Sequence, residues 1–384
     1  MREVVGTAVE HSAGQPNETE LRRLRDDLAA PLRVGVVGTP GDGASTLAAA
    51  LGAVAPAGVT VVDLSDADLP DRTDRTDRTD RIVPVGALVA VLRPAGSAAQ
   101  VVTRAGVDPD AVSLLYVLGR ADEVCGGQPE DWDEALAVAA GCQRDPELRR
   151  TGQPVTPVSG LLALAAVRLT DDDVTTLRNL GPDPDDADPD ADHRIAPVLE
   201  RLGWFGVRLA AQLLCDGAVT DRDGLAAELA ERSGLSRLGD ALAGPFVRRA
   251  QVLRARAAML ELEEVIRHAP ATSERVLYRL EQLRIGTHEL AELDLSDALT
   301  DGSMVLIGSD RDAALRLLGT ADGRTTARLG LPDDASPAQV RSAITEELAH
   351  WRQQAAHPAS TSSVRRAAEV LARTCESLLP TTVD

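Results

Sequence analysis

The sequence of 384 residues contains no lysine, so all 40 of its basic residues are arginine. Mutational drift in a genome that favours arginine and alanine codons is sufficient to explain this bias. Such drift converts lysine to arginine. A lysine that a motif requires but that is replaced by alanine therefore needs a separate explanation, and Ala44 is such a position.

Cysteine and aromatic residues are also scarce. The four cysteines have no C-x-x-C spacing and no histidine cluster nearby, which argues against a zinc site and a disulfide framework, so we expect free thiols. Aromatic residues make up 2% of the chain, so each is expected to anchor a core rather than to stack on a ligand. This prediction covers Trp204, Phe205, Tyr278 and Trp351. The isolated histidines are expected at the surface, namely His268, His288, His350 and His357.

Long apolar runs and basic patches are missing as well. The net charge of −20 makes nucleic acid an unsuitable partner and disfavours anionic lipid, so membrane association is expected only peripherally or through a partner protein. A stretch such as "ALVAVL" (87–92) is far shorter than the roughly 20 residues that span a bilayer. The N-terminus is polar and has no apolar signal core, which predicts a cytoplasmic location.

Short apolar segments alternate with helical patterns in the first half of the chain. Strands are predicted at 32–38, 58–64, 86–92, 112–119 and 153–160, and a small-residue helix at 44–54. Continuous apolar strands separated by helices indicate an α/β domain in which a parallel sheet carries helices on both faces. We expect this domain at 31–180, after a helical lead-in at 1–30 whose leucines at 21, 24 and 28 repeat at helical spacing.

The second half is predicted to be helical throughout. An Asp- and Pro-rich linker at 181–194 precedes a helical bundle at 195–300 and a C-terminal helical region at 301–384. Within the bundle, 245–269 and 272–293 are expected to form an antiparallel helical hairpin. A further helix is predicted at 336–356, with Ser336 as its N-cap and Pro337 at its first position.

A tripeptide repeat, "DRTDRTDRTDR" (71–81), lies between the second and third predicted strands. It carries its own counter-charges and no helical or strand period, which is typical of a solvated loop. A regulated switch segment or a set of phosphorylated threonines is the functional alternative.

The segment "GTPGDGAS" (38–45) connects the first predicted strand to the helix that follows it. The phosphate-loop pattern is G-x-x-x-x-G-K-[ST], and Gly38, Gly43 and Ser45 keep its glycine and hydroxyl positions. Backbone amides at a helix N-terminus attract anions without any lysine. Ala44 lacks the ammonium group that would reach the β- and γ-phosphates, and Asp42 adds a negative charge. Phosphate binding is therefore expected to be weakened and hydrolysis is placed in doubt.

Further nucleotide-binding positions follow the later strands. A GTPase needs a switch threonine and a D-x-x-G segment after the loop. Asp63 ends the second strand so soon after Ser45 that little room is left for a first switch, and Asp66 stands where the glycine of D-x-x-G belongs. In "LGRADEV" (118–124), Asp122 can pair with the N1–H and 2-amino group of guanine and Arg120 can stack on its ring. Ser159 in "PVSG" (157–160) can approach the base.

The candidate site has simpler interpretations. The loop glycines can serve only a tight strand-to-helix turn, and Asp122 can serve only as the cap of the helix that follows it. The complete candidate nucleotide site comprises Gly38, Gly41, Asp42, Gly43, Ala44, Ser45, Thr46, Arg120, Asp122 and Ser159, with Ser45 and Asp63 as candidate Mg²⁺ ligands. No catalytic residue is assigned.

The ordered set of segments resembles the bacterial dynamin-like GTPases of the isoniazid-inducible type, from about residue 30 to residue 295. The segments that carry the resemblance are "LRVGVVGTPGDGASTLAAAL", "VSLLYVLGRADEV", "TPVSGLLALAA", "LGWFGVRLAAQLL", "LAERSGLSRL" and the helical pair from Phe246 to Leu293. The resemblance implies GTP or GDP with Mg²⁺ as ligand, with Gly38, Gly43 and Ser45 facing phosphates and metal. It also implies that Asp122 and Ser159 face the base, and that a related intact GTPase is a partner.

Three alternative functions are consistent with these observations. The first is that of a pseudo-GTPase, which binds GTP weakly or not at all and regulates or scaffolds an intact dynamin-like partner. Alternatively, it is an active GTP hydrolase with an atypical loop, completed by an arginine from a partner. The third possibility is a nucleotide-independent assembly protein that self-associates through its helical region.

Overall fold

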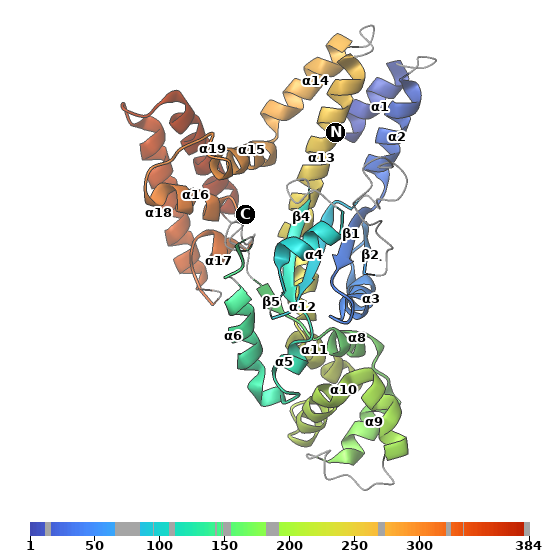
Figure 1. The fold of residues 1–384 in the computed structure, drawn as a ribbon. Coiled ribbons are helices and arrows are strands. Elements are labelled where there is room, and N and C mark those ends of the chain that lie inside the picture. Colours follow the sequence, from blue (N-terminus) through green and yellow to red (C-terminus); the bar gives the residue numbers. More distant parts are fainter. Residues whose placement is uncertain are drawn as a thin grey trace, which may run out of the picture. The chain divides into compact units, whose positions relative to one another are not determined.

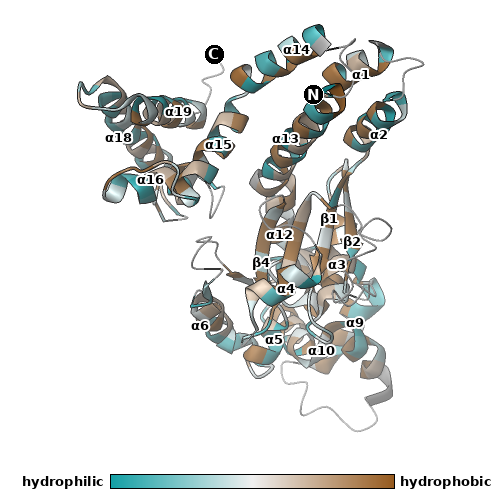
Figure 2. Cartoon of the chain, turned by 45° about the horizontal axis from the view of Figure 1, so that its top comes forward, coloured by the Kyte–Doolittle hydropathy of each residue, from teal (hydrophilic) through white to brown (hydrophobic). Residues whose placement is uncertain are grey.

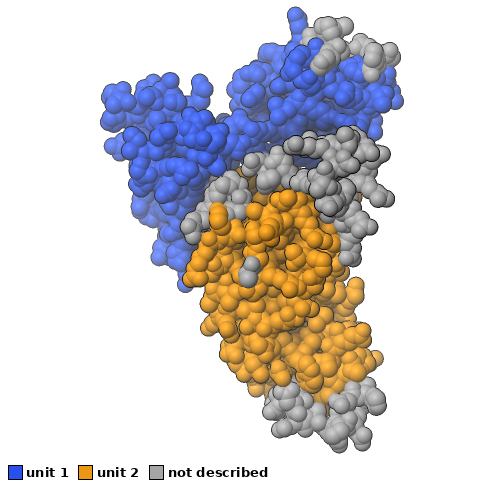
Figure 3. All heavy atoms as spheres, viewed as in Figure 1, with its two compact units in different colours: residues 1–30, 252–384 blue, residues 31–251 orange. Residues whose placement is uncertain are grey.

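The computed structural model divides the chain into two compact units (Figures 1 and 3). Unit 1 comprises Met1–Ala30 and Val252–Asp384, and unit 2 comprises Pro31–Gln251. The structure describes residues 1–11, 17–65, 85–94, 96–106, 112–142, 144–146, 148, 155–181, 192–267, 273–319, 324–332 and 334–379. The repeat at 71–81, Asp66 and most of the predicted linker lie outside these residues.

Unit 2 is built on a five-stranded sheet whose strands all pair in parallel. The strands are β1 (Leu32–Val37), β2 (Val59–Asp63), β3 (Ala87–Leu92), β4 (Ser113–Leu118) and β5 (Val155–Pro157). Their order in the sheet is β2-β1-β3-β4-β5. The chain order therefore reverses beside β1, and in open parallel sheets ligands bind at the carboxyl ends of strands at such a switch point. The predicted α/β fold class is confirmed.

Two hydrophobic cores cover the two faces of the sheet. Successive side chains of a strand point to opposite faces of the sheet, so the residues of β3 alternate between the two cores. Val89 and Val91 lie in the first core, and Leu88 and Ala90 lie in the second. The first core includes residues of α3 (Ala44–Val54), α8 (Gly160–Arg168), α12 (Leu235–Ala243) and the start of α13 (Pro245–Arg267). The second core includes residues of α4 (Ala98–Arg104) and α6 (Trp132–Cys142). Hydrophobic residues accordingly run along the central strands (Figure 2).

A third core extends unit 2 with helices that follow the sheet. It joins α5 (Ala121–Val124), α8 and α9 (Asp171–Leu180) to α10 (Asp192–Cys215) and α11 (Arg222–Arg232), with the turn η1 (Pro129–Asp131) beside them. A capping box between Thr170 and Asp173 begins α9. The helical geometry of α10 is interrupted at Gly203, whose φ is 66°. The predicted end of this helix at Gly217 is confirmed by its φ of 68°.

Unit 1 contains two helical cores. One joins α1 (Arg2–His11) and α2 (Glu18–Ala29) to the later part of α13 and to α14 (Ser273–Gly286), and it includes the three predicted leucines of the lead-in. The other joins α15 (His288–Thr300), α16 (Ser309–Leu317), α17 (Thr325–Arg328), α18 (Pro337–Ala356) and α19 (Ser362–Leu378). The predicted cap of α18 is confirmed, because Ser336 and Gln339 form a reciprocal capping box.

Several local predictions need correction. The segment 272–293, predicted as one helix, is divided between α14 and α15 at Thr287. Trp351 and Phe205 are buried as predicted, but Trp204 is 43% exposed and Tyr278 is 65% exposed. The prediction was wrong for Trp204 and Tyr278, because helical spacing from leucines does not distinguish the helix face that packs against the core from the face next to it. His288 is half-buried and hydrogen-bonded to Thr374 rather than free at the surface.

Candidate functional site

Three segments that the sequence singled out meet at the carboxyl edge of the sheet. A Cβ on Gly119, after β4, would lie 2.6 Å from Val91 Cγ1 and would collide with the carbonyl oxygen of Asp42. A Cβ on Gly160, after β5, would lie 3.3 Å from the carbonyl oxygen of Gly43. The loop after β1 is therefore in contact with the segments after β4 and β5, each through a glycine.

The loop after β1 closes on one of its own carboxylates. Asp42 is 2% exposed, and its side chain accepts hydrogen bonds from the Thr39 amide, from Thr39 Oγ1 at 3.2 Å and from the Ala44 amide at 3.1 Å. A Cβ on Gly38 would lie 2.5 Å from Asp42 Oδ1. The space that glycine leaves at the first position of the motif is therefore filled by the Asp42 carboxylate.

Other amides of the loop keep their donors free. Within the part of the chain that the structure describes, the backbone amides of Gly43, Ser45 and Thr46 donate to no acceptor. They belong to the N-terminus of α3, where the helix dipole favours an anion. Ala44 is 2% exposed and packs in the first core of the sheet, so no cation extends from the lysine position.

The candidate Mg²⁺ ligands are placed on separate elements. Ser45 is exposed on the first turn of α3. Asp63 ends β2, and its Oδ1 accepts a hydrogen bond of 2.9 Å from the Ser65 amide. Among the described residues, no group of three or more histidine, cysteine, aspartate or glutamate side chains is arranged to hold a metal ion.

The candidate base-binding residues follow β4. Arg120 has a φ of 53°, and it is the one residue other than glycine with a positive φ in the described ranges. Its Nη1 lies 2.7 Å from Glu123 Oε1, and its Cγ would lie 3.6 Å from a Cβ on Gly43. Such a backbone conformation costs on the order of 1 kcal/mol or more and is more frequent at functional sites. The side chain thus lies beside the phosphate loop.

Asp122 is half-buried in the first turn of α5. Its carboxylate does not cap that helix, which contradicts the capping alternative, and it has no hydrogen-bond or ion-pair partner among the residues that the structure describes. The Ser159 hydroxyl accepts a hydrogen bond of 3.3 Å from the Leu162 amide and caps α8. Ser159 therefore uses one acceptor position within its own helix, whereas the Asp122 carboxylate accepts no hydrogen bond from the described residues.

Arg93 is a residue that the sequence patterns did not identify. It follows β3 directly, and its Nη2 donates a hydrogen bond of 3.2 Å to the carbonyl oxygen of Pro40 in the loop. Nη2 would also lie 3.0 Å from a Cβ on Gly41. In open parallel sheets, ligands bind at the carboxyl ends of the strands beside the switch point, here β1 and β3. The strand order, had it been known, would therefore have indicated Arg93, the first residue after β3. Arg93 supplies a positive charge to the loop that has no lysine.

The fit of a nucleoside triphosphate to this loop is incomplete. Free amides and the Arg93 guanidinium favour an anion, but the buried Asp42 carboxylate takes two of the loop amides and adds negative charge where a phosphate would lie. In this conformation the residues present do not fit a triphosphate with its Mg²⁺.

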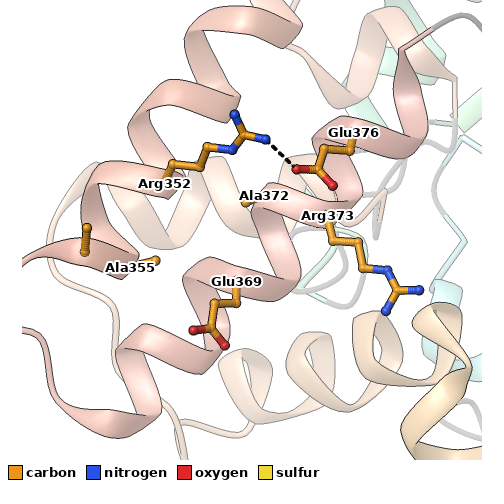
Figure 4. Close-up of a pocket in the computed structure, with 7 residues that line it drawn as sticks. Arg352, Ala355, Glu369, Ala372, Arg373 and Glu376 are labelled. Carbon is orange, nitrogen blue, oxygen red and sulfur yellow. Dashed lines mark hydrogen bonds and ion pairs between the residues drawn. The ribbon is translucent and has the colours of Figure 1, made fainter.

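A hollow of about 420 Å³ lies between α18 and α19. Figure 4 shows Arg352 and Glu376 directed toward one another across it, with 2.7 Å between Nη2 and Oε1. The remaining lining consists of three alanines and of Glu369 and Arg373. All four charged residues of the lining are exposed, and no buried polar group of the described residues lines this hollow, so it lacks the enclosed polar groups of a binding site.

A polar cluster lies inside the second helical core of unit 1. Thr374 Oγ1 donates to Glu292 Oε1 at 2.6 Å, and His288 Nε2 lies 3.1 Å from the same hydroxyl. Arg328 Nη2 donates to Glu292 Oε1 at 3.4 Å. Burial raises the pKa of Glu292, but the hydrogen bonds from His288 and Thr374 and the charge of Arg328 outweigh it, so the pKa lies below its ordinary value. The cluster joins α15, α17 and α19, which indicates a structural role.

No helix among the described residues combines the length and the apolar character needed to cross a bilayer. All four cysteines are free, as predicted.

Comparison with known proteins identifies relatives of this chain. It is homologous to the isoniazid-induced protein IniC of Mycobacterium tuberculosis, in strain CDC 1551 / Oshkosh and in strain ATCC 25618 / H37Rv. In each case the identity is 30% over 325 residues, which cover 77% of this chain and 64% of the relative. The chain therefore spans slightly less than two thirds of the length of the curated relatives that it matches. No family model matches the chain, and no solved structure matches it significantly. The isoniazid-induced group that the sequence segments indicated thus contains a homologue of this chain.

Proposed function

We propose that the chain is a dynamin-like GTPase homologue with a degenerate nucleotide site, which binds GTP weakly or not at all and acts as a regulatory or scaffolding partner of an intact dynamin-like GTPase. One observation carries the proposal: a phosphate-type loop at the switch point of the sheet has Ala44 in its first core and the Asp42 carboxylate in its cradle. The position of this loop in the sheet supports a nucleotide site, whereas the charges at Asp42 and Ala44 differ from those that such a site needs.

Two features support a remaining affinity for guanine nucleotides. The segments after β1, β4 and β5 are in contact, as a site for phosphates and base requires. In the segment after β4, the Asp122 carboxylate has no hydrogen-bond or ion-pair partner among the described residues, and a carboxylate can accept from both N–H groups on the edge of guanine. A residual GTP or GDP site with Mg²⁺ would use these groups and the free amides of α3.

Turnover needs groups that this loop does not supply. Charge that develops during phosphoryl transfer is stabilised by the loop lysine and by Mg²⁺. Ala44 offers no charge, and the Asp63 carboxylate is directed to the amide of Ser65. Loss of the lysine together with an acid in the cradle favours a binding or regulatory role over hydrolysis.

The partner is proposed from the homology to the isoniazid-induced protein and from the helical part of the chain. In dynamin-like proteins a helical bundle connects the nucleotide cycle to assembly, so a lysine-containing relative is the expected partner. Self-association through the helical region is the second possibility. We place this role in the cytoplasm, with any membrane association peripheral or through the partner.

Two measurements test the proposal. Calorimetric titration of the full chain with GTP, GDP and ATP in the presence of Mg²⁺ should give weak guanine-selective heat or none, and Asp122→Ala should abolish any that is seen. The GTP turnover of an intact dynamin-like relative should change when the chain is added. Steady GTP hydrolysis by the chain alone would identify an active enzyme. No effect on the relative would identify a nucleotide-independent assembly protein.

A further inference from the structure

We propose that Asp42 acts as a tethered competitor of the nucleotide phosphate, a built-in anion that occupies the loop and must leave before a phosphate can enter. This inference rests on the proposed nucleotide site and concerns its regulation. It makes weak binding a property of one side chain rather than of a collapsed loop.

The Asp42 carboxylate lies where the loop would hold an anion. Asp42 is 2% exposed, and within the described residues its carboxylate forms no ion pair and accepts hydrogen bonds from Thr39 and the Ala44 amide alone. A buried charge without such partners is costly, so this carboxylate is stabilised by loop amides and by the N-terminus of α3. Those are the groups that hold a phosphate in such a loop.

The Asp42 carboxylate also fills the space next to Gly38. The Cα of Gly38 faces the carboxylate so closely that a Cβ would lie 2.6 Å from Asp42 Cγ. A phosphate in the same cradle would lie within a few ångströms of this negative charge. Two like charges about 4 Å apart repel by several kcal/mol at the effective dielectric of a protein surface, so the two anions exclude one another.

The conformation of the loop allows it to release the Asp42 side chain. Asp42 stands between Gly41 and Gly43, with φ values of 84° and 87°, and glycine changes its backbone conformation at low cost. With Asp42 in place, the amides of Gly43, Ser45 and Thr46 have no acceptor among the residues that the structure describes. If the carboxylate leaves, the Thr39 and Ala44 amides join them, and Arg93 remains on the loop at Pro40. A complete set of anion donors is then available.

The test compares Asp42→Asn with the unchanged protein. Asparagine keeps the shape of the side chain but removes its charge, and its NH₂ group cannot accept one of the two amide bonds. Asp42→Ala removes the competitor completely, and its backbone conformation needs no glycine. Asp221→Asn is the matched control, because Asp221 also accepts a helix-terminal amide bond, from Gly224 at 2.8 Å, but it begins α11.

Calorimetric titration with GTP and GDP in the presence of Mg²⁺, and with inorganic pyrophosphate, measures the competition directly. We expect both Asp42 variants to bind at least about tenfold more tightly than the unchanged protein, which corresponds to about 1.4 kcal/mol, while Asp221→Asn leaves the affinity unchanged. Thermal melting without ligand establishes that each variant is folded.

The possible results separate this inference from the proposed function. Folded Asp42 variants that bind no more tightly than the unchanged protein would overturn the competitor role, and the effect of the chain on its intact relative would still test the proposed function. Tighter binding of pyrophosphate and of both nucleotides would support the competitor role even if the relative is unaffected. Tight binding by the unchanged protein would overturn it, because the carboxylate then does not compete.

Discussion

Gly119→Ala tests the contact between the phosphate loop and the end of β4. Gly119 is buried and its φ is not in the left-handed region, so alanine can adopt the backbone conformation and any cost is steric. The added methyl group would lie 2.6 Å from Val91 Cγ1 and would collide with the carbonyl oxygen of Asp42. The second atom belongs to backbone, so a rotamer change cannot relieve the overlap.

The expected cost is that of an overpacked core position, about 1–3 kcal/mol. For a domain of roughly 150–250 residues, each kcal/mol lowers the melting temperature by about 2–4 °C. Thermal melting followed by circular dichroism should therefore show the transition of unit 2 lowered by about 2–12 °C. The loop must also shift, so any nucleotide affinity should fall with it.

Gly52→Ala is the matched control in the same unit. Gly52 lies inside α3, and a Cβ there would meet no atom within 4 Å. Replacing glycine in a helix interior by alanine stabilises by about 0.5–1 kcal/mol, so this variant should melt about 1–4 °C higher. A Gly119→Ala protein as stable as the unchanged one, or a shift of the same sign in both variants, would refute the proposed contact between Gly119 and the loop.

Three further predictions concern unit 1 and the cysteines. Glu292→Gln should destabilise the protein by about 1–3 kcal/mol at pH 7, because the carboxylate accepts charge-assisted hydrogen bonds. The folded pKa is lowered, so this stabilisation is present above the unfolded pKa of about 4.3 and is lost as pH falls through the folded one; acid melting curves should show the two proteins converging as the pH falls below the unfolded pKa. Burial raises the pKa of Cys375 to about 12, so iodoacetamide at pH 8 should label the exposed Cys215 long before Cys375, and equal labelling rates in the native protein would contradict this burial. Trp351→Ala should cost about 3–5 kcal/mol in denaturant unfolding, since the ring is 1% exposed, and a loss below about 1 kcal/mol would show that it is not a core residue.

The fold class could be predicted because its signals are local. In a short apolar run such as 87–92, neither face of the strand is polar, which is typical of a strand that is buried on both sides of a sheet. The helix at 337–356 was predicted from its cap, since Ser336 and Pro337 are favoured by local geometry at those positions. The exposure of Trp204 and Tyr278 could not be predicted, because helical spacing defines a stripe but not which neighbour covers its edge.

The candidate site was predictable to a different extent. Gly38, Gly43 and Asp122 could be named as candidates because their motifs fix residue spacing within one segment. Arg93 was missed because its contact with the loop depends on the adjacency of β1 and β3, which are separated in the chain by β2. Asp42 was recognised as an unfavourable charge, but its burial depends on the two glycine conformations beside it, and the motif does not specify those.

The same carboxylate explains how the loop keeps its form without a ligand. Backbone amides that point into the loop cost free energy when they have no acceptor, so a loop without a bound anion is stabilised when its own side chains accept from them. The Asp42 carboxylate accepts hydrogen bonds from the amides of Thr39 and Ala44. The Ala44 side chain packs in the first core, whereas the charged end of a lysine at this position would have to extend out of that core. Restoring lysine at position 44 alone would therefore place an ammonium group beside the Asp42 carboxylate, and the pair would neutralise one another before any phosphate arrived. We therefore expect removal of the Asp42 charge to raise the affinity for an anion by itself, and a lysine at position 44 to add to that affinity only when Asp42 has also been replaced.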